Sequence, residues 1–384
     1  MHQRNVSTMK ALINPFVTSG YVSSEYFCDR EQETERLIRE VTNGNNVALI
    51  STRRMGKTGL IQHCFHQPEI KDNHYVFFVD IYASKSLRDF VYALSREILE
   101  GLKPFGRKTI ERFWNSLKSL QAGITFDPVG NPSFNVQLGD IRSSEATLEE
   151  IFRYLEQADK PCLVAIDEFQ QIASYPEKNV EAILRTHIQH CVNTHFIFAG
   201  SQRHVMGNIF SSASRPFYQS VSMMKLDKID EQKYTDFAVA QFARYKKKIE
   251  PEVVKDIYDR FDGITWYIQK MLNMLFSLTP AGETCTKEII PEALKGVIAS
   301  YHYTFEETLF RLPERQKELL IAITKEGEAK SVTSGRFVNK YSLASSSSVQ
   351  SALKGLLEKD FITYEHGVYR TYDRFFCIWL TENY

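Results

Sequence analysis

Three residue types that handle phosphates stand side by side at Gly56, Lys57 and Thr58, directly after a short apolar run. A glycine lets the backbone approach a phosphate, a lysine reaches its oxygens as a point charge, and a threonine hydroxyl can ligate Mg²⁺. The N–H groups of a loop that opens a helix add a cradle for the β-phosphate. The segment fits the second half of the P-loop pattern GxxxxGK[ST], although Ser51 stands where the pattern has its first glycine.

The remaining residues of this loop extend the candidate site. We expect Arg53, Arg54, Met55 and Gly59 to bind nucleotide together with the glycine, lysine and threonine. A guanidinium in such a loop can meet phosphate oxygens, or it can pair with the carboxylate of a neighbouring molecule. Both roles are open for the two arginines.

A second apolar run, 162–166, ends in the carboxylates Asp167 and Glu168. Open α/β sheets bind ligands at the carboxyl ends of their strands, so a buried strand that delivers two acids there is the Walker B pattern. Asp167 would hold Mg²⁺, directly or through water, and Glu168 would polarise the water that attacks the γ-phosphate. The alternative is a strand that ends in acidic surface residues, but the P-loop upstream favours nucleotide binding.

Polar and basic residues after later strands complete the predicted catalytic set, which already includes Lys57 and Glu168. Ser201 and Gln202 come after the apolar run 196–199, and either could touch the γ-phosphate or the attacking water, although an ordinary strand-end turn would look the same. Arg215 precedes a further strand and could act as an arginine finger, in cis or in trans. Surface ion pairing is the alternative for Arg215 and for Arg203.

Short apolar strands that alternate with helices predict the elements that position these residues. The pattern is typical of a parallel sheet with helices on both faces. Asp29 and Gln32 resemble a capping box at the start of the first helix. The segment at about 122–140 alternates around a turn-rich centre and predicts an inserted β-hairpin. The expected strands span 47–50, 75–81, 162–166, 195–199 and 221–226.

The pattern changes after residue 228. Helical periodicity dominates 229–310, and 311–384 shows helices followed by a hairpin signal at His366-Gly367, as in a winged helix. We therefore divide the chain into an N-terminal arm and P-loop ATPase core (1–228), a helical lid with a linker helix (229–310), and a winged-helix domain (311–384). The fold class is α/β, with a helical lid and a C-terminal winged helix.

Composition limits the partners. The 384 residues carry 47 Lys and Arg against 47 Asp and Glu, so no global charge favours nucleic acid or an anionic membrane. No apolar stretch approaches the roughly 18 residues of a spanning helix. The six cysteines form no CxxC pair, and His63, Cys64 and His66 lack a second ligand pair, so a metal or disulfide framework is not expected. These features favour a cytoplasmic protein with reduced thiols.

Taken together, the motifs resemble the archaeal/bacterial ATPase family of the STAND branch of AAA+ P-loop proteins. The resemblance implies ATP or ADP as ligand, a five-stranded sheet in AAA+ order, a lid that closes over the base, and Arg30 on the adenine side. Asp29 replaces the glycine of the family's opening motif, and Thr265 replaces the lid proline. The matching stretches are 27–31, 53–58, 166–170, 199–201 and 262–267.

Two function classes follow from these observations. The first is a Mg²⁺-dependent ATPase that hydrolyses ATP slowly and works as a conformational switch, with a protein partner or self-association. The second is a nucleic-acid-binding winged-helix protein with a secondary or inactive ATP site. Residues 312–384 contain ten Lys and Arg and nine Asp and Glu, which gives little basic surface for phosphate contacts. Nucleic acid is therefore the less favoured partner.

Overall fold

The computed structural model describes residues 12–119, 125–126, 132–133 and 141–384, which form two compact units. Ser19–Tyr234 make up one unit. Thr235–Tyr384 make up the other, together with the described residues up to Thr18. The predicted domain boundaries at about 228 and 310 stay a prediction.

A five-stranded sheet forms the centre of the first unit. Its strand order is β2-β5-β6-β1-β7 and all neighbours pair in parallel, as the predicted α/β fold requires. The strands are short because the apolar runs that form them in the sequence are short and are bounded by residues typical of turns and helices. Their bounds are β1 Val47–Ile50, β2 Tyr75–Asp80, β5 Cys162–Asp167, β6 Thr194–Gly200 and β7 Ser222–Lys225.

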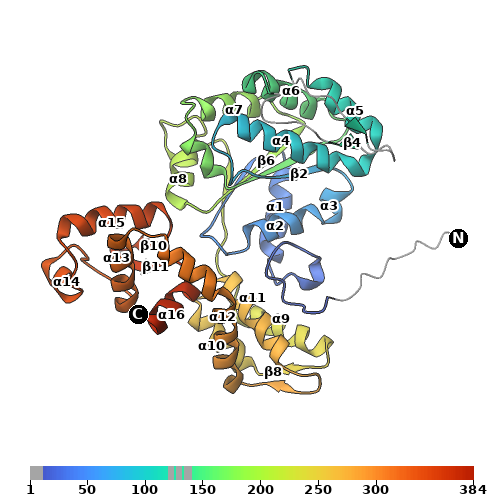
Figure 1. The fold of residues 1–384 in the computed structure, drawn as a ribbon. Helices are drawn as coiled ribbons and strands as arrows, with labels where there is room; N and C mark the ends of the chain where they lie inside the picture. The colour runs from blue at the N-terminus through green and yellow to red at the C-terminus, as the bar shows by residue number, and fades with distance from the viewer. Residues whose placement is uncertain (1–11, 120–124, 127–131, 134–140) are drawn as a thin grey trace. The chain divides into compact units, whose positions relative to one another are not determined.

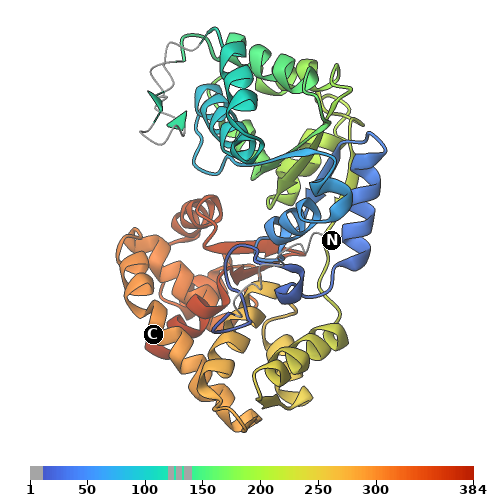
Figure 2. The same ribbon diagram turned by 90° about the vertical axis from the view of Figure 1, so that its right-hand side faces the viewer.

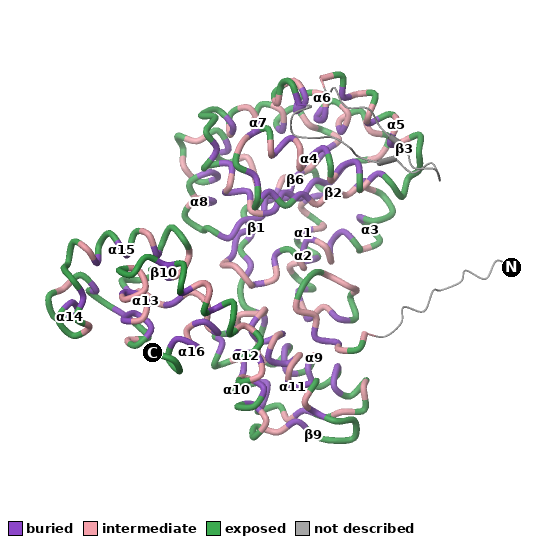
Figure 3. The backbone as a smooth tube through the Cα atoms, in the orientation of Figure 1, coloured by how far each residue is buried: buried purple, intermediate pink, exposed green. Residues whose placement is uncertain are grey.

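Helices cover both faces of this sheet (Figure 1). The helices α1, α2 and α3 lie on one face, and α4 to α7 lie on the other. Every residue of β5 is buried, and Figure 3 shows the buried backbone running through the middle of the unit. The bounds are α1 Glu31–Thr42, α2 Lys57–Phe65, α3 Pro68–Lys71, α4 Leu87–Leu102, α5 Arg107–Ser116, α6 Ser144–Glu156, α7 Val180–Ile188 and α8 Arg203–Ser211.

Two sequence expectations need comment here. The predicted hairpin at about 122–140 falls mostly outside the described residues, and only its strands β3 (Thr125–Phe126) and β4 (Pro132–Ser133) are described, paired antiparallel. The expected capping box at Asp29 is wrong, because Arg30 is the N-cap residue of α1 and no side chain caps that end. Both Asp29 and Arg30 adopt left-handed φ angles, of 54° and 73°, which takes Asp29 out of the extended geometry of a capping residue.

The second unit is helical, apart from two small sheets. A parallel pair of two-residue strands joins β8 (Lys248–Ile249) to β9 (Thr284–Cys285), and an antiparallel pair forms the wing, β10 (Ile362–Glu365) with β11 (Val368–Thr371). The second pair follows a helical segment, as a winged helix requires. The helices are α9 Glu231–Arg244, α10 Pro251–Arg260, α11 Thr265–Leu278, α12 Ile290–Phe310, α13 Glu314–Glu326, α14 Gly335–Lys340, α15 Ser346–Glu358 and α16 Arg374–Asn383.

The winged helix and the preceding helices share one aromatic core. Phe375 of α16 lies 5.1 Å from the ring of Phe261 and 5.1 Å from that of Tyr267. The Tyr267 hydroxyl accepts a hydrogen bond of 3.0 Å from the backbone N–H of Arg374. Figure 2 shows the red C-terminal helix running among the orange helices of this unit. The helix α16 therefore packs in the same body as α11.

The N-terminal arm is a structural part of this second unit. Phe16 is fully buried, with its ring 5.6 Å from that of Phe242 and 5.9 Å from that of Phe276. Asn14 donates to the carbonyl of Asn273 at 2.9 Å, and Asn273 donates back to the carbonyl of Phe16 at 2.9 Å. The chain passes from this unit into the first one directly after Thr18.

Candidate nucleotide-binding site

The strand order brings the sequence motifs to one edge of the sheet. The P-loop follows β1, the two carboxylates end β5, and β6 lies between these strands and ends at Gly200. Because all three strands are parallel, their carboxyl ends meet at the same edge. The segment after β6 therefore emerges between the two motif-bearing strands.

Thr58 and Asp167 are in direct contact. The Thr58 hydroxyl donates a hydrogen bond of 2.6 Å to Oδ2 of Asp167, although 109 residues separate them along the chain. Oδ1 of Asp167 accepts from the backbone N–H of Glu168 at 2.9 Å. Burial raises the pKa of Asp167 above its ordinary value, and the Thr58 hydrogen bond opposes that shift only in part. A hydroxyl and a carboxylate at this separation form a donor set of the kind that Mg²⁺ prefers.

Lys57 folds back into the loop and makes only long contacts. Its Nζ lies 3.4 Å from each of three oxygens, the carbonyl and hydroxyl of Ser51 and the carbonyl of Thr52. The side chain is 6% exposed. Burial lowers the pKa of Lys57, while the charges of Asp167 and Glu168 oppose that shift. A buried ammonium with three weak partners is a fitting partner for a phosphate.

The backbone of the loop is bent in a way that suits an anion. Gly56 has a φ of 93° and Arg54 a φ of 69°, so the left-handed turns come late in the loop. Gly56 is the N-cap residue of α2, and no side chain caps that helix. A helix N-terminus without a capping side chain is a favourable place for a phosphate. Ser51 has no left-handed φ and is fully buried, so serine is tolerated at this position.

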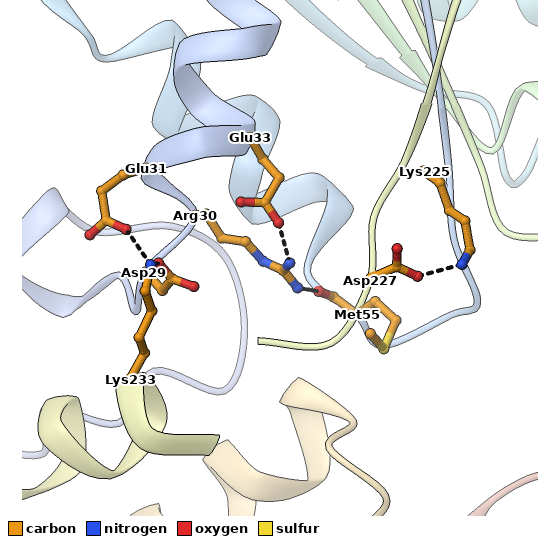
Figure 4. Close-up of polar contacts among 8 residues, drawn as sticks. All are labelled: Asp29, Arg30, Glu31, Glu33, Met55, Lys225, Asp227 and Lys233. Carbon is orange, nitrogen blue, oxygen red and sulfur yellow. Dashed lines mark hydrogen bonds and ion pairs between the residues drawn. The ribbon is translucent and has the colours of Figure 1, made fainter. Parts of the chain in front are cut away.

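Arg30 ties the start of α1 to the P-loop (Figure 4). Its Nη2 donates to the carbonyl of Met55 at 3.3 Å, and its Nη1 pairs with Glu33 at 2.7 Å. The Arg30 side chain is 3% exposed. In this arrangement Arg30 holds the loop in place. Its place on the adenine side, which the resemblance implies, stays a prediction.

Asp29 stands where the opening motif of the ATPase family has a glycine. Its φ of 54° lies in the left-handed region, which glycine adopts most easily. Its carboxylate pairs with Lys233 at 2.5 Å, and Lys233 also lies 3.5 Å from Glu31 (Figure 4). Burial raises the pKa of Asp29, but its hydrogen bonds and the charge of Lys233 outweigh burial and hold the pKa below its ordinary value. The ion pair joins the start of α1 to the start of α9.

Gly59 lies where α2 meets the segment before α1. A Cβ at this position would come within 3.2 Å of the ring of Phe27. Phe27 in turn stacks on His63, with ring centroids 4.4 Å apart, and the Tyr21 hydroxyl lies 3.0 Å from Nδ1 of His63. Close packing accounts for this glycine. Within the described part of the chain, no group of three or more His, Cys, Asp or Glu side chains could hold a metal ion, including the neighbourhood of His63.

Glu168 is held by two side chains, one of which the sequence did not single out as a site residue. The Ser201 hydroxyl donates to Oε2 of Glu168 at 2.9 Å. Nε2 of Gln170 donates to the same oxygen. Gln170 lies two residues after Glu168 in the 3₁₀ helix Phe169–Ser174. In the sequence, Gln170 was marked only as the last residue of 166–170, one of the stretches that resemble the ATPase family.

Arg215 is engaged away from the loop. It pairs with Glu181 of α7 at 2.5 Å, and among the described residues no hydrogen bond or ion pair joins it to Lys57, Asp167 or Glu168. The positive charges of Arg53 and Arg203 lower the pKa of Lys57. The finger role of Arg215 stays a prediction.

Comparison with known proteins places these features in a family. Residues 27–271 match the family described as an ATPase domain predominantly from Archaea, and residues 303–382 match a probable winged helix domain. No curated protein matches the sequence.

Solved structures share the fold over nearly the whole chain. A Walker-type ATPase of Pyrococcus abyssi is 16% identical, with a TM-score of 0.65, and the alignment covers 96% of this chain and 99% of that one. The ORC2 protein of Aeropyrum pernix, in its ADPNP and ADP complexes, is 14% identical, with a TM-score of 0.60 and 96% of each chain covered. The ORC1 protein of Aeropyrum pernix, in complex with DNA, is 12% identical, with a TM-score of 0.53 and 93% of each chain covered.

Proposed function

The chain belongs to the family of ATPase domains found predominantly in Archaea, and from this premise we propose that it is a Mg²⁺-dependent ATPase that works as a nucleotide-driven switch. The hydrogen bond between Thr58 and Asp167 carries the proposal, because it joins the two motifs in a hydroxyl and carboxylate pair that would hold Mg²⁺. The match to the winged helix domain supports an output element at the other end of the chain.

Each predicted residue has a distinct part in the proposed reaction. The N-terminus of α2 and Gly56 bind the β-phosphate, and Lys57 leaves its weak contacts with Ser51 and Thr52 for the β- and γ-phosphate oxygens. Thr58 and Asp167 would hold Mg²⁺, which would supply positive charge against the charge that develops on the phosphates. Arg53, Arg54 and Met55 form the loop around the phosphate chain.

Glu168 acts on the water in this proposal. Its carboxylate orients a water molecule toward the γ-phosphorus and accepts a proton as the new P–O bond forms and the bond to the bridging oxygen breaks. Ser201 lies beside this carboxylate, at the position expected of a sensor for the γ-phosphate. Arg215 remains a candidate finger only in trans, because within the chain Glu181 holds it.

A switch role fits the way the chain connects its two units. Lys233 pairs with Asp29, next to the arginine that supports the P-loop, and α9 continues from Lys233 into the second unit. A change at the loop on hydrolysis can therefore reach the helix that leads to the winged helix. A protein partner or a second copy of the chain would read that change.

Nucleic acid is the second candidate partner, and the exposed surface of α15 argues against it. Exposed serines dominate the start of this helix, and Lys354, its one basic residue, lies 3.9 Å from Glu358. DNA binding generally needs several Lys or Arg side chains on phosphates. The ORC1 protein in complex with DNA shares the fold at 12% identity, which leaves the partner of this chain open to experiment.

The test is ATP turnover and particle size measured together, with and without duplex DNA. We expect slow phosphate release that requires Mg²⁺, is lost in Lys57→Ala, and falls by about 10²- to 10³-fold in Glu168→Gln, which still binds ATP. An ATP-dependent change in particle size would support self-association. Turnover that is unaffected by Lys57→Ala would contradict the proposal, and a salt-dependent complex with DNA would favour the second candidate.

A further inference from the structure

We propose that Gln170 is a positioning residue that fixes the orientation of the Glu168 carboxylate for water activation. This inference rests on the proposed ATPase function. It concerns three side chains, Glu168, Gln170 and Ser201, that the structure joins in one hydrogen-bonded group.

Both donors of this group act on the same carboxylate oxygen. Nε2 of Gln170 and the hydroxyl of Ser201 each donate to Oε2 of Glu168, and they lie 3.4 Å from one another. Among the described residues, no hydrogen bond or ion pair reaches Oε1 of Glu168. A carboxylate with one oxygen fixed by two donors can turn only slightly, and its second oxygen remains for a water molecule.

The burial of Gln170 makes this restraint rigid. Gln170 is 4% exposed and Ser201 is 8% exposed, so neither side chain has water as an easy alternative partner. Only the amide nitrogen of Gln170 can face a carboxylate, because its amide oxygen would repel it. Oε1 of Gln170 is consequently turned inward, where it is buried without a partner. Leaving a buried acceptor unpaired costs free energy, so the orientation is set by Glu168.

Gly200 at the end of β6 makes room for this arrangement. A Cβ at Gly200 would lie 2.6 Å from Oε1 of Gln170, which is closer than such contacts occur. The glycine therefore lets the glutamine amide lie across the end of β6, between the strand that carries Glu168 and the segment that carries Ser201. The backbone of Glu168 itself has a left-handed φ of 56°, which further fixes its direction.

The Gln170→Met variant tests the inference, because methionine has a similar length but donates no hydrogen bond. We expect kcat for ATP hydrolysis to fall about 10- to 100-fold, since a misplaced catalytic group loses rate on this scale. The dissociation constant for ATP should stay within about twofold, because the side-chain hydrogen bonds of Gln170 go to Glu168 and Ser201. Gln171→Met is the matched control, since Gln171 is the next residue of the same 3₁₀ helix and hydrogen bonds to neither Glu168 nor Ser201 through its side chain.

The double variant separates positioning from a general structural effect. In a Glu168→Gln background, Gln170→Met should lower the remaining rate no further, because Gln170 acts only through the carboxylate. An unchanged kcat, an increased kcat, or an equal loss in both backgrounds would overturn the inference. If Gln170→Met fails to fold, Gln170→Asn keeps the amide but shortens its reach to Glu168, and it should also lower kcat without changing ATP affinity. Absence of Mg²⁺-dependent turnover in the unmodified protein would instead reject the proposed ATPase function.

Discussion

At the scale of single residues, the contact between Thr58 and Asp167 supports the proposed Mg²⁺ site. The hydroxyl and the carboxylate lie 2.6 Å apart, and burial raises the pKa of Asp167. A cation at this point would relieve the cost of burying the charged carboxylate. Metal and nucleotide should therefore bind together rather than independently.

Thr58→Val removes the hydroxyl and keeps the shape of the side chain. We expect the Mg²⁺-dependent part of ATP affinity to fall by at least about tenfold, the lower end of what a lost partner at a metal site costs. Titration of ATP with and without Mg²⁺ measures this. Thr42→Val on α1 is the control, because the Thr42 hydroxyl is exposed and bonds only within its own helix. A Thr58 variant with the same Mg²⁺ dependence as the control would contradict the assignment.

Most of this site could be predicted from the sequence, because its chemistry follows strand ends that apolar runs reveal. Thr58 and Asp167 were expected at one metal, and they are in contact. Gln170 and the role of Arg30 toward Met55 could not be predicted, since both depend on where side chains fold back in three dimensions. Arg215 was expected as a finger on its position before β7, and only the folded chain shows that Glu181 holds it.

At the scale of elements, β6 and α8 each contain a glycine, and the two glycines differ in the space that surrounds them. At Gly200, a Cβ would collide with Gln170 and Met206. At Gly207, inside α8, a Cβ would meet nothing within 4 Å. We expect Gly200→Ala to lower the free energy of unfolding by about 1–3 kcal/mol through overpacking. Gly207→Ala should raise it by about 0.5–1 kcal/mol, because alanine favours a helix interior.

Urea unfolding of the two variants compares the same added methyl group in two settings. Opposite signs are expected for the two changes in the free energy of unfolding. Equal effects would mean that the crowding around Gly200 relaxes at no cost. This pair also tests the packing that lets Gln170 lie over the end of β6.

Most helices and strands could be predicted because their apolar residues recur with a clear period. The elements that could not be predicted are too short to show such a pattern. The helical periodicity over 229–310 agrees with the helices α9, α10, α11 and α12, which lie within that range. The helix α14 has six residues and β8 and β9 have two each, too few for a periodic pattern to show. The helix α6 begins at Ser144 with Ser143 as its cap, four residues before Leu148, the first residue of its apolar face.

At the scale of the whole molecule, the N-terminal arm stabilises the helical unit. Phe16→Ala removes a fully buried ring from among Phe237, Phe242 and Phe276. We expect a loss of about 3–5 kcal/mol in the free energy of unfolding of that unit. Hydrogen exchange should rise in α9 and α11 and stay unchanged in the five-stranded sheet. A uniform rise across the chain would contradict the assignment of the arm to one unit.

Four half-buried histidines should make the sheet-containing unit sensitive to acid. Burial lowers the pKa of His63, His74, His187 and His195 below the ordinary value. The unfolded chain then binds protons more readily than the folded chain, so these groups stabilise the fold above pH 6.5 and lose that contribution as the pH falls. NMR titration should give folded-state pKa values below 6.5 for all four. Values above 6.5 would reverse the sign of their effect.

The same reasoning predicts the effect of removing one of these groups. His195→Gln should make the free energy of unfolding less dependent on pH between about 5 and 7, since glutamine does not titrate. Denaturant unfolding at several pH values measures this slope. A slope equal to that of the unmodified chain would show that His195 titrates alike in both states.

The central claim is that the P-loop and the Asp167-Glu168 pair form one site for Mg²⁺ and ATP. Calorimetric titration of ATP into the full chain, with Mg²⁺ and then with excess chelator, tests this most directly, with Lys57→Ala measured alongside. We predict saturable binding that weakens when Mg²⁺ is removed and is lost in Lys57→Ala. Binding of equal strength under all three conditions, or no binding to the unmodified chain, would contradict the claim.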